Sequence, residues 1–594
     1  MSLPQLFGPL SGREEELLSA CLQNLEFAKG TTIFKAGTEG DAAYLIDSGE
    51  VRIELDRPEL DSDAILRFMG PGSVMGELSL LDRLPRSASA VAHTDCKLRR
   101  IDAASLDALS KDQPALVLAV IRALAKDAAT KLRHTTSQLS DYMFGGPGDR
   151  EVDDMVAKAI AAQAAYASWP EDKVDALLGA LTEVFVANAE ALAIATVAET
   201  HLGNAADKTL KNKVASFHVY KSLVGKVGAG AISTDPIRKV TEIASPVGVI
   251  FGLIPMTNPV ATAYFKVLIS LKSRNSLILS FHHAALGVGN RVGELISGVL
   301  AKHGAPPDLV QWVKQRSNRK KTVNFMSHPG VSLILATGGG AMVKAAYSSG
   351  TPAIGVGPGN APCWIAGDAD PDQAAQSVVL SKSFDNGLIC GSEHNLVVEE
   401  TIREPFIAAL ERAGAAVLTP EEVARFTAAA IDPETQQFRG QMVGQSAELL
   451  AGFAAVKRPY PIKLIVAPAT WNGEATPYAG EKMSPVLSLF TAKGDDDAIA
   501  LCKRLLAYMG AGHTAIIHSR DEARITRFGS VMPASRILVN CPGAHGVVGL
   551  ASGLVPSLTL GCGSFGGNST TDNVSYRNLI NIKRLAHFIQ PEGT

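Results

Sequence analysis

Short alternating runs of hydrophobic and polar residues fill the chain from its start to about residue 110. Glycine or aspartate interrupts these runs about every ten residues, as in TTIFKAGTEGDAAYLIDSGEVRIEL and SASAVAHTDCKLRRID. A period of two with frequent turn residues is typical of antiparallel strands, so this part is expected to form a small β-barrel. Helical spacing before the barrel, and after it in Pro114–Leu132, predicts flanking helices.

From about residue 151 the pattern becomes helical and alanine-rich, and it then alternates between apolar runs, loops and helices. Val247–Ala285 contains an apolar run, a Pro/Asn loop, a helix and a second apolar run, which is the order of a βαβ unit. The sequence therefore predicts an α/β part with an open parallel sheet, which binds ligands where its strands end. Loops at such ends contain Thr257 and Asn258, and Thr337, Gly338 and Gly339.

Between these two parts, Arg133–Asp154 reads RHTTSQLSDYMFGGPGDREVDD. The segment is polar, contains glycine and proline, and lacks a strong hydrophobic period. We therefore expect a linker that separates the barrel part from the α/β part.

Composition narrows the classes of function. The chain has 594 residues, 46% of them hydrophobic and 19% charged, which indicates a globular protein of more than one domain. A net charge of −3 argues against a nucleic-acid binder or a polybasic membrane surface and favours small-molecule partners. Seven cysteines show neither disulfide-scaffold nor CxxC spacing, and no His/Cys/Asp cluster has metal-ligand spacing, so no metal is expected. Because no signal peptide or membrane span is recognisable, we expect a cytoplasmic protein.

The clearest reactive candidate is Cys390, in KSFDNGLICGSEHN. An Asn-Gly turn signal precedes it, and Gly391 and Ser392 follow it, so no bulky neighbour along the chain covers its sulfur. A thiolate is a nucleophile, but a thiol with a pKa of about 8.5 is only slightly ionised at neutral pH and needs a polar or electropositive setting. The alternative is a structural cysteine. We prefer that alternative for Cys363, Cys502, Cys541 and Cys562.

Gly70–Ala92, GPGSVMGELSLLDRLPRSASAVA, resembles the phosphate-binding cassette of cyclic-nucleotide-binding domains in its Gly-Glu-Leu followed by Pro-Arg-Ser. The resemblance implies a jelly-roll type barrel that binds cAMP or cGMP through Gly76, Glu77, Leu78, Arg86 and Ser87. Free amides near Gly76 would face the cyclic phosphate, Arg86 would neutralise it, and Glu77 would accept the ribose 2′-hydroxyl. Ser87 would add a hydroxyl. The alternatives are ordinary turn residues, a surface charge, or a degenerate member of the family that binds no nucleotide.

The chain from about residue 195 onward resembles the aldehyde dehydrogenase superfamily. Its motifs are those of the CoA-acylating branch, which includes the aldehyde dehydrogenase half of bifunctional alcohol/aldehyde dehydrogenases. The matching stretches, in order, are THLGNAADKTLKN, PVGVIFGLIPMTNP, LISLKSRNSLILS, TGGGAMVKAAYSSGTPAIGVGPGN, SFDNGLICGSEHN, EKMSPVLSLF, GAGHTAIIHS and SLTLGCGSFGGNSTTDNV.

Together the two resemblances imply a multidomain protein. The expected domains are a cyclic-nucleotide-binding domain at 1–135, a linker at 136–155, a Rossmann-like NAD(P)-binding domain at 156–383, an α/β catalytic domain at 384–563, and a C-terminal return to the cofactor or oligomerisation region at 564–594. A homo-oligomer, dimeric or larger, is also expected.

By position, the resemblance makes Cys390 the nucleophile and gives the oxyanion two donors, the side-chain amide of Asn258 and the backbone N–H of Cys390. Glu481 would hold the nicotinamide ribose. The implied cofactor-binding residues are Pro255, Thr257, Thr337, Gly338, Gly339, Gly357, Gly359 and Glu481. His513 would be an acid/base or a CoA-site residue, with a structural histidine as the alternative. NAD is the expected cofactor, and NADP stays open because Phe281 stands where relatives commonly have proline.

One departure separates two chemistries. Hydrolytic members of the superfamily activate water with a glutamate, and Val356 occupies the matching place here. The resemblance therefore implies that a thioester on Cys390 persists until the thiol of coenzyme A attacks it, in a reversible conversion of a short-chain aldehyde to an acyl-CoA. Relatives handle acetaldehyde, succinic semialdehyde and sulfoacetaldehyde, so the aldehyde stays open.

Two other functions remain as alternatives. One is a non-acylating or phosphate-dependent dehydrogenase of the same fold, and the other is a cyclic-nucleotide receptor whose dehydrogenase part is only a scaffold. The presence of Cys390, Asn258 and Glu481 argues against the scaffold. Because no helix-turn-helix module follows the barrel, a bound nucleotide is expected to act on the dehydrogenase part.

Overall fold

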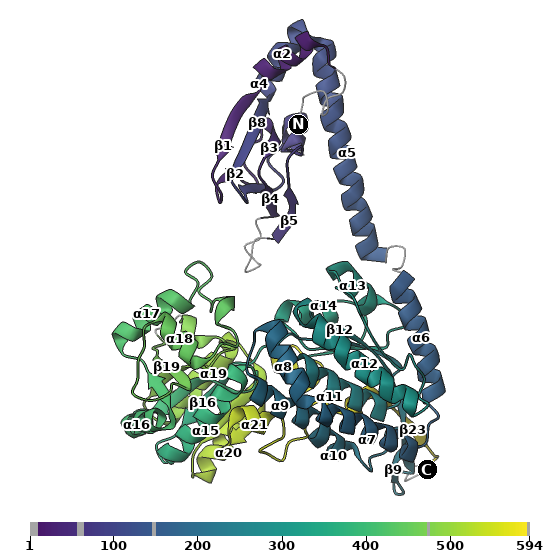
Figure 1. Cartoon of the computed structure of the whole chain (residues 1–594), viewed down its shortest axis with the longest axis vertical. Coiled ribbons are helices and arrows are strands. Elements are labelled where there is room, and N and C mark those ends of the chain that lie inside the picture. The colour runs from purple at the N-terminus through teal and green to yellow at the C-terminus, as the bar shows by residue number, and fades with distance from the viewer. Residues whose placement is uncertain (1–9, 56–63, 145–149, 472–475, 591–594) are drawn as a thin grey trace. The chain divides into compact units, whose positions relative to one another are not determined.

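The computed structural model of the chain describes residues 10–55, 64–144, 150–471 and 476–590. The chain forms two compact units, Met1–Pro147 and Gly148–Thr594 (Figure 1). Within these ranges no single helix is long and apolar enough to cross a membrane. In the same ranges, one pair of helices, Glu171–Ala187 and Ala189–Thr200, is together long and apolar enough by length and composition alone, but it is bent by 58°.

The first unit contains two antiparallel four-stranded sheets, in the orders β1-β8-β3-β6 and β2-β7-β4-β5. The strands are β1 (Gln23–Phe27), β2 (Thr32–Phe34), β3 (Ala42–Ser48), β4 (Val51–Leu55), β5 (Ala64–Met69), β6 (Val74–Met75), β7 (Ser89–Ala92) and β8 (Cys96–Asp102). Residues of both sheets share one apolar cluster, which includes Tyr44, Val51 and Leu98. The antiparallel β domain predicted from the alternation is confirmed.

The helices of the first unit are α2 (Gly12–Ala20), α3 (Glu77–Asp82), α4 (Ala103–Asp112) and α5 (Pro114–Phe144). Helix α5 packs Val120 and Leu124 against Leu18, Leu80 and Leu106 of the other three helices. Because α5 continues to Phe144 and the next helix begins at Arg150, most of the segment expected to be an irregular linker is helical. The reason is that residues 133–144 contain no glycine or proline, so nothing in them ends the helix.

The second unit begins with helices around a five-stranded parallel sheet of order β13-β12-β11-β14-β15. The strands are β11 (Val249–Ile254), β12 (Ser276–Phe281), β13 (Val310–Trp312), β14 (Leu333–Ala336) and β15 (Ala353–Gly355). The helices are α6 (Arg150–Tyr166), α7 (Glu171–Ala187), α8 (Ala189–Thr200), α9 (Ala205–Lys213), α10 (Val219–Leu223), α11 (Pro259–Lys272), α12 (Leu286–Lys302), α13 (Arg319–Ser327) and α14 (Gly340–Tyr347).

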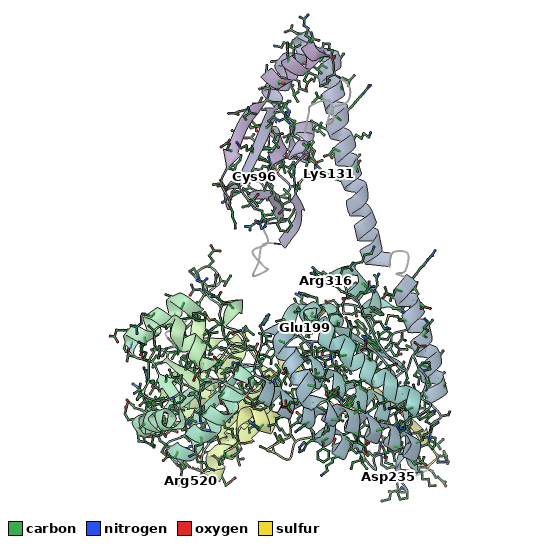
Figure 2. The ribbon with its side chains drawn as sticks, in the orientation of Figure 1. Cys96, Lys131, Glu199, Asp235, Arg316 and Arg520 are labelled. Carbon is green, nitrogen blue, oxygen red and sulfur yellow. The ribbon has the colours of Figure 1, made fainter. Side chains whose placement is uncertain are left out.

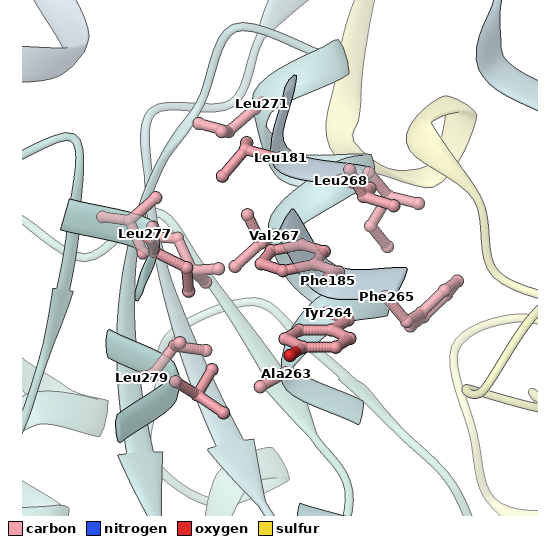
Figure 3. Packing of buried hydrophobic residues seen from close by; sticks show 14 of the residues in the cluster. Leu181, Phe185, Ala263, Tyr264, Phe265, Val267, Leu268, Leu271, Leu277 and Leu279 are labelled. Carbon is pink, nitrogen blue, oxygen red and sulfur yellow. The ribbon is translucent and has the colours of Figure 1, made fainter. Parts of the chain in front are cut away.

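The predicted βαβ unit is present as β11, α11 and β12, with β11 and β12 in parallel register. Helix α11 is buried along its whole length. Figure 3 shows its residues Tyr264 and Leu268 packed near Leu181 and Phe185 of α7, and the rings of Phe185 and Tyr264 stack with their centres 3.7 Å apart. This packing fixes where α11 begins, and therefore where Asn258 lies.

The order of strands makes the edge of β11 next to β14 the switch point of this sheet. The chain first fills the side of β12 and β13 and then crosses to β14 and β15 on the other side of β11. Loops that follow β11 and β14 diverge at this switch point, which is where open parallel sheets bind ligands.

The rest of the second unit is built on a seven-stranded parallel sheet of order β18-β19-β20-β17-β16-β21-β22. The strands are β16 (Ala361–Ile365), β17 (Glu393–Glu399), β18 (Ala415–Val417), β19 (Leu464–Pro468), β20 (Val486–Ala492), β21 (Gly512–His518) and β22 (Ala534–Val539). The helices are α15 (Pro371–Ser383), α16 (Arg403–Ala413), α17 (Pro420–Ala430), α18 (Ala447–Phe453), α19 (Asp495–Tyr508), α20 (Glu522–Val531) and α21 (Gly543–Val547).

The change from one sheet to the other falls earlier in the chain than the domain boundary expected between residues 383 and 384. Strand β16 pairs with β17 and β21, so it belongs to the seven-stranded sheet together with α15. The change of sheet falls between Gly355 and Ala361, before the loop that holds Cys390. The sequence could not place it, because AIG and APCWI are both short buried apolar runs and only their pairing partners differ.

The end of the described chain returns to the first half of the unit. Strand β23 (Ile580–Ala586) pairs antiparallel with β10 (Val240–Pro246), which in turn pairs with β9 (Gly230–Asp235). Ile582 and Leu585 of β23 are 41% and 52% exposed, and Phe588 beyond it is 81% exposed. This three-stranded sheet therefore presents apolar side chains to its surroundings.

Candidate active site

Cys390 lies in a strained loop that joins α15 to β17, residues 384–392, here called the nucleophile loop. Three successive residues in it, Asp385, Asn386 and Gly387, have φ angles of 47°, 53° and 75°. Glycine adopts this left-handed backbone readily, whereas Asp385 and Asn386 do so at a cost in energy. Contacts from the surrounding structure must therefore hold the loop in place.

The Cys390 thiol is partly exposed and packs on an apolar cluster formed by residues of α15 and β17. Burial raises the pKa of this thiol to about 12, the carboxylate of Glu481 acts in the same direction, and Arg536 opposes it. The sulfur is therefore protonated at neutral pH, and a positive charge brought to it would favour the reactive thiolate.

Asn258 reaches the nucleophile loop from the other half of the unit. It follows β11 and is the N-cap of α11, but its side chain makes no capping hydrogen bond. Instead its Nδ2 donates to the carbonyl oxygen of Leu388, 3.2 Å away, and its Oδ1 accepts from the ammonium group of Lys211. The remaining N–H of this amide makes only a long contact of 3.5 Å, to the hydroxyl of Thr257. It lies beside the backbone that leads to Cys390 and can turn to a better acceptor, which is what an oxyanion donor requires.

The GVGPGN segment crosses the nucleophile loop at Gly359. A Cβ atom on Gly359 would lie 1.7 Å from the carbonyl oxygen of Cys390, so only glycine permits this approach. The N–H of Gly359 donates to Oε1 of Glu481 over 3.0 Å. Burial raises the pKa of Glu481 to about 7. The structure thus brings Gly359 and Glu481 together with Cys390, while the N–H of Gly357 bonds to Asn568 over 3.3 Å.

The other residues expected to bind a cofactor follow β11 and β14, the two neighbouring strands at the switch point. Pro255 and Thr257 follow β11, and Thr337, Gly338 and Gly339 lie between β14 and α14. The hydroxyl of Thr337 is buried and has no hydrogen-bond partner among the residues described, and no side chain caps the first turn of α14. A free hydroxyl and free helix amides suit the pyrophosphate of a dinucleotide. The residues present therefore fit NAD(P).

Comparisons with known proteins identify the family of the chain. Residues 142–569 match the aldehyde dehydrogenase family, over well more than half of the chain. The chain belongs to the aldehyde dehydrogenase family. Residues 24–113 match the cyclic nucleotide-binding domain.

The relatives of this dehydrogenase include CoA-acylating enzymes. It is 38% identical to the bifunctional aldehyde-alcohol dehydrogenase AdhE of Escherichia coli K12, over 73% of this chain and 49% of that protein. The chain thus spans about half the length of the first curated relatives that it matches. The structure of an acetylating aldehyde dehydrogenase from Geobacillus thermoglucosidasius is 38% identical with a TM-score of 0.72, over 75% of this chain and 98% of that one.

A third relative was solved with a ligand. The propionaldehyde dehydrogenase of Rhodopseudomonas palustris with bound propionyl-CoA is 27% identical with a TM-score of 0.67, over 73% of this chain and 94% of that one. Taken together, the matches confirm the prediction of a cyclic-nucleotide-binding domain joined to an aldehyde dehydrogenase that resembles the acylating enzymes.

A buried polar layer supports the active site of the dehydrogenase, and the sequence analysis missed it. Nζ of Lys382 donates to the carbonyl oxygen of Lys482 over 2.9 Å, and the N–H of Lys482 donates to Nδ1 of His394 over 2.8 Å. Burial lowers the pKa of Lys382 to about 7. These bonds tie the segment that carries Glu481 to β17, which follows Cys390. A signal in the sequence could have revealed this layer. Lys382 and His394 lie in the same motif as Cys390, and Lys482 directly follows Glu481.

His513 lies in β21 and is fully buried. Its Nδ1 is 2.9 Å from the hydroxyl of Thr514, and its Nε2 has no hydrogen-bond partner in the described part of the chain. Burial, with the charge of Arg536, lowers the pKa of His513 to about 3. An imidazole with so low a pKa is a weak base and is not protonated at neutral pH, which does not favour the acid/base interpretation. The CoA-site and structural interpretations of His513 therefore stay open.

A small, partly open pocket adjoins the nucleophile loop. Its walls are mostly apolar, and they are formed by Lys211, Val214, Phe384, Ile389, Ala544, His545, Val548, Leu550 and Leu558. Phe384 and Ile389 belong to the nucleophile loop, so one wall of this pocket is formed by the loop that carries Cys390.

The cyclic-nucleotide cassette of the first unit has the expected helix. Gly76 has φ of 75°, and α3 begins at the next residue. Arg86 is buried, its Nη1 donates to the carbonyl oxygen of Gly76 over 3.0 Å, and its guanidinium group lies 4.5 Å above the ring of Phe34. Nε of Arg86 has no hydrogen-bond partner among the described residues. Leu78 and Ser87 are exposed.

The carboxylate of Glu77 is already occupied by a residue that the sequence analysis missed. Glu77 is buried, and its Oε1 accepts from Nζ of Lys131 over 2.8 Å. Lys131 comes from α5, as Figure 2 shows, and also donates to the carbonyl oxygen of Val74 over 2.7 Å. The group expected to receive a ribose hydroxyl is thus bound to helix α5.

Possible metal ligands were compared across the described residues. In the described ranges, no group of three or more His, Cys, Asp or Glu side chains could hold a metal ion.

Proposed function

We propose that the second unit is a CoA-acylating aldehyde dehydrogenase, which converts a short-chain aldehyde, CoA and NAD(P)⁺ reversibly to an acyl-CoA and NAD(P)H. The observation that carries this proposal is the contact between Asn258 and the nucleophile loop at Leu388, because it sets an amide donor beside the backbone of Cys390.

The reaction begins with Cys390 as a thiolate. Its sulfur forms a bond to the aldehyde carbon while the π electrons of the carbonyl move to the oxygen. The Asn258 amide and the Cys390 N–H stabilise that oxyanion. When the carbonyl re-forms, the carbon loses a hydride and a thioester on Cys390 remains. NAD(P)⁺ supplies the hydride acceptor, and Glu481 would orient its ribose hydroxyls.

Val356 supports acyl transfer to CoA over transfer to water. Its buried side chain stands where hydrolytic relatives carry a water-activating glutamate, and it cannot accept a proton. The thiol of CoA then attacks the thioester carbon, the bond from that carbon to Sγ of Cys390 breaks, and the proton of the CoA thiol is released. Thiol–thioester exchange needs less basic assistance than hydrolysis does.

The pocket next to the nucleophile loop supports a short aliphatic aldehyde. Its lining is apolar except for Lys211 and His545, and Lys211 is already paired with Asp385. A carboxylate or sulfonate on the substrate would therefore lose water without gaining an unpaired cation. We propose acetaldehyde or propanal as the substrate class, ahead of succinic semialdehyde or sulfoacetaldehyde.

We further propose that cAMP or cGMP binds the first unit and changes the rate or assembly of the dehydrogenase. The specific support is the buried guanidinium group of Arg86, whose unpaired Nε suits an anion. Glu77 would exchange Lys131 for the ribose hydroxyl, so binding would release a contact made by α5.

A homo-oligomer and a reducing, cytoplasmic setting also stay proposals. Support for the oligomer comes from the exposed apolar residues on and beyond β23, such as Leu585 and Phe588. Support for the reducing setting comes from the seven cysteines, all of which are free.

The test is NAD(P)⁺ reduction by the full chain with short aldehydes, with and without CoA and cAMP. CoA-dependent reduction with acyl-CoA as product is the expected result. Equal rates without CoA would identify a non-acylating dehydrogenase. Cyclic-nucleotide binding without any reduction would favour a receptor with a scaffold-like dehydrogenase part.

A further inference from the structure

Lys208, Lys211 and Asp385 form a buried charged cluster that no step above uses. Their exposed fractions are 3%, 5% and 0%. Both lysines belong to α9, whereas Asp385 begins the left-handed stretch of the nucleophile loop. Nζ of Lys208 lies 3.0 Å from Oδ2 of Asp385, and Lys211 pairs with the same oxygen. Burying two cations against one carboxylate costs free energy of folding, because one positive charge is not neutralised by that carboxylate. The presence of the second lysine therefore calls for an explanation.

The cluster continues to the loop that carries the oxyanion donor. Lys211 donates to Oδ1 of Asn258, and Lys208 donates to the carbonyl oxygen of Thr257 over 2.8 Å. An ammonium group can only donate, so the Asn258 amide must turn its oxygen toward Lys211. On its other side the amide meets the carbonyl oxygen of Leu388, which can only accept. The two contacts therefore require the same orientation, and the amide cannot flip.

We propose that Lys211 is a positioning residue for aldehyde oxidation at this site. It fixes the Asn258 amide with its NH₂ group toward the nucleophile loop, and its charge polarises the amide so that the remaining N–H becomes a stronger donor to the oxyanion. Asp385 holds the Lys211 ammonium group in place, and so links the nucleophile loop to the orientation of the donor.

A purely structural role for the cluster explains less. Asp385 is already held by Lys208 and by the N–H of Asn204, which donates to its Oδ1 over 2.9 Å. The N–H of Asp385 donates in turn to Asp207 over 2.7 Å. The strained loop thus has partners without Lys211, and Lys211 is the member of the cluster that reaches Asn258.

The test is a double-mutant cycle in the full chain with K211M, N258A and the double variant, assayed with propanal, CoA and NAD(P)⁺. We expect N258A to lower kcat by about 10²- to 10³-fold and K211M by about 10- to 100-fold, with little change in the KM for aldehyde. Because Lys211 acts through the amide, the double variant should match N258A within about twofold. K213M is the matched control, because Lys213 is exposed on the same helix and should behave like the wild type.

Two further measurements separate positioning from a loosened fold. K211Q keeps a neutral donor to Oδ1 without the charge, so its kcat should fall between those of the wild type and K211M, and it serves if K211M does not fold. The rate of alkylation of Cys390 should be the same in K211M and the wild type, since Lys211 acts on the amide and not on the thiol.

Two results would overturn the inference about Lys211 and leave the proposed function intact. One is a double variant whose loss of kcat equals the product of the losses in the two single variants. The other is a K211M variant as active as the wild type. The inference rests on the proposed function. A wild type without CoA-dependent NAD(P)H formation would therefore overturn both, and that outcome is visible before any variant is compared.

Discussion

Free enzyme should react slowly with thiol reagents at Cys390, and bound NAD(P)⁺ should accelerate the reaction. Burial and the Glu481 carboxylate raise the pKa of this thiol to about 12. At pH 7.5 the thiolate fraction is then roughly 3 × 10⁻⁵, against roughly 10⁻¹ for a thiol with a pKa of about 8.5. The higher basicity of the thiolate recovers roughly 1.6 powers of ten in nucleophilicity, so the net effect is about a 100-fold slower reaction than for a small ordinary thiol.

The raised pKa also predicts how the alkylation rate of Cys390 changes with pH. A thiol with a raised pKa stays protonated throughout the neutral range, so its alkylation rate should rise about tenfold per pH unit from pH 7 to pH 10 without a plateau. An ordinary thiol levels off near its pKa of about 8.5. A bound NAD⁺ that brings its positive ring to the sulfur would favour the thiolate, so NAD⁺ should raise the rate at least about tenfold.

The assay is iodoacetamide labelling of the full chain, with the modified peptide that contains Cys390 quantified by mass spectrometry, because Cys21 is also partly exposed. The E481Q variant tests whether the carboxylate of Glu481 contributes to the raised pKa of Cys390. Glu481 has a pKa of about 7, so its removal should accelerate labelling of Cys390 above pH 7 and have less effect below. Labelling of free enzyme at the rate of a small thiol at pH 7.5 would refute the argument from burial.

Other predictions follow from the same contacts. Cys390→Ser should abolish turnover but leave cofactor binding, measured by quenching of protein fluorescence, nearly intact, and substantial residual turnover would contradict the assignment of the nucleophile. With Val356 in place of a base, CoA-free enzyme should release at most about one NAD(P)H per active site, whereas sustained production with free acid would show hydrolysis. Arg86→Ala should weaken cAMP or cGMP binding by calorimetry about 10- to 100-fold, since a charge-assisted bond is lost. Lys131→Met should change affinity in the opposite direction by freeing Glu77, and weaker binding would exclude competition.

The sequence could single out the candidate site residues because each stands in text with a local physical signature. Cys390 follows a turn and precedes small residues, Asn258 follows a buried strand and precedes a proline that starts a helix, and Gly359 lies in a glycine-rich loop. Alternation at period two likewise identified the β domain, because each strand has a polar and an apolar face.

Residues that act through partners far along the chain gave no such signature. Lys208 and Lys211 look like ordinary surface lysines of an amphipathic helix, and only the folded chain brings Asp385 to them across about 180 residues. The same holds for Lys131, which pairs with a residue 54 positions earlier. The change of sheet before Ala361 had no signature for a related reason. Which strand a short apolar run pairs with depends on the folded sheet and cannot be read from the run itself.

Gly359 offers a way to separate the two activities proposed for the chain. Every other amino acid carries the Cβ atom that would fall 1.7 Å from the carbonyl oxygen of Cys390, so even Gly359→Ala must displace the backbone of the nucleophile. No reactive side chain is removed by that change, and the first unit is not altered. If the proposed function holds, Gly359→Ala gives a form of the chain without turnover that still carries the first unit, so that nucleotide binding can be followed without any aldehyde being consumed.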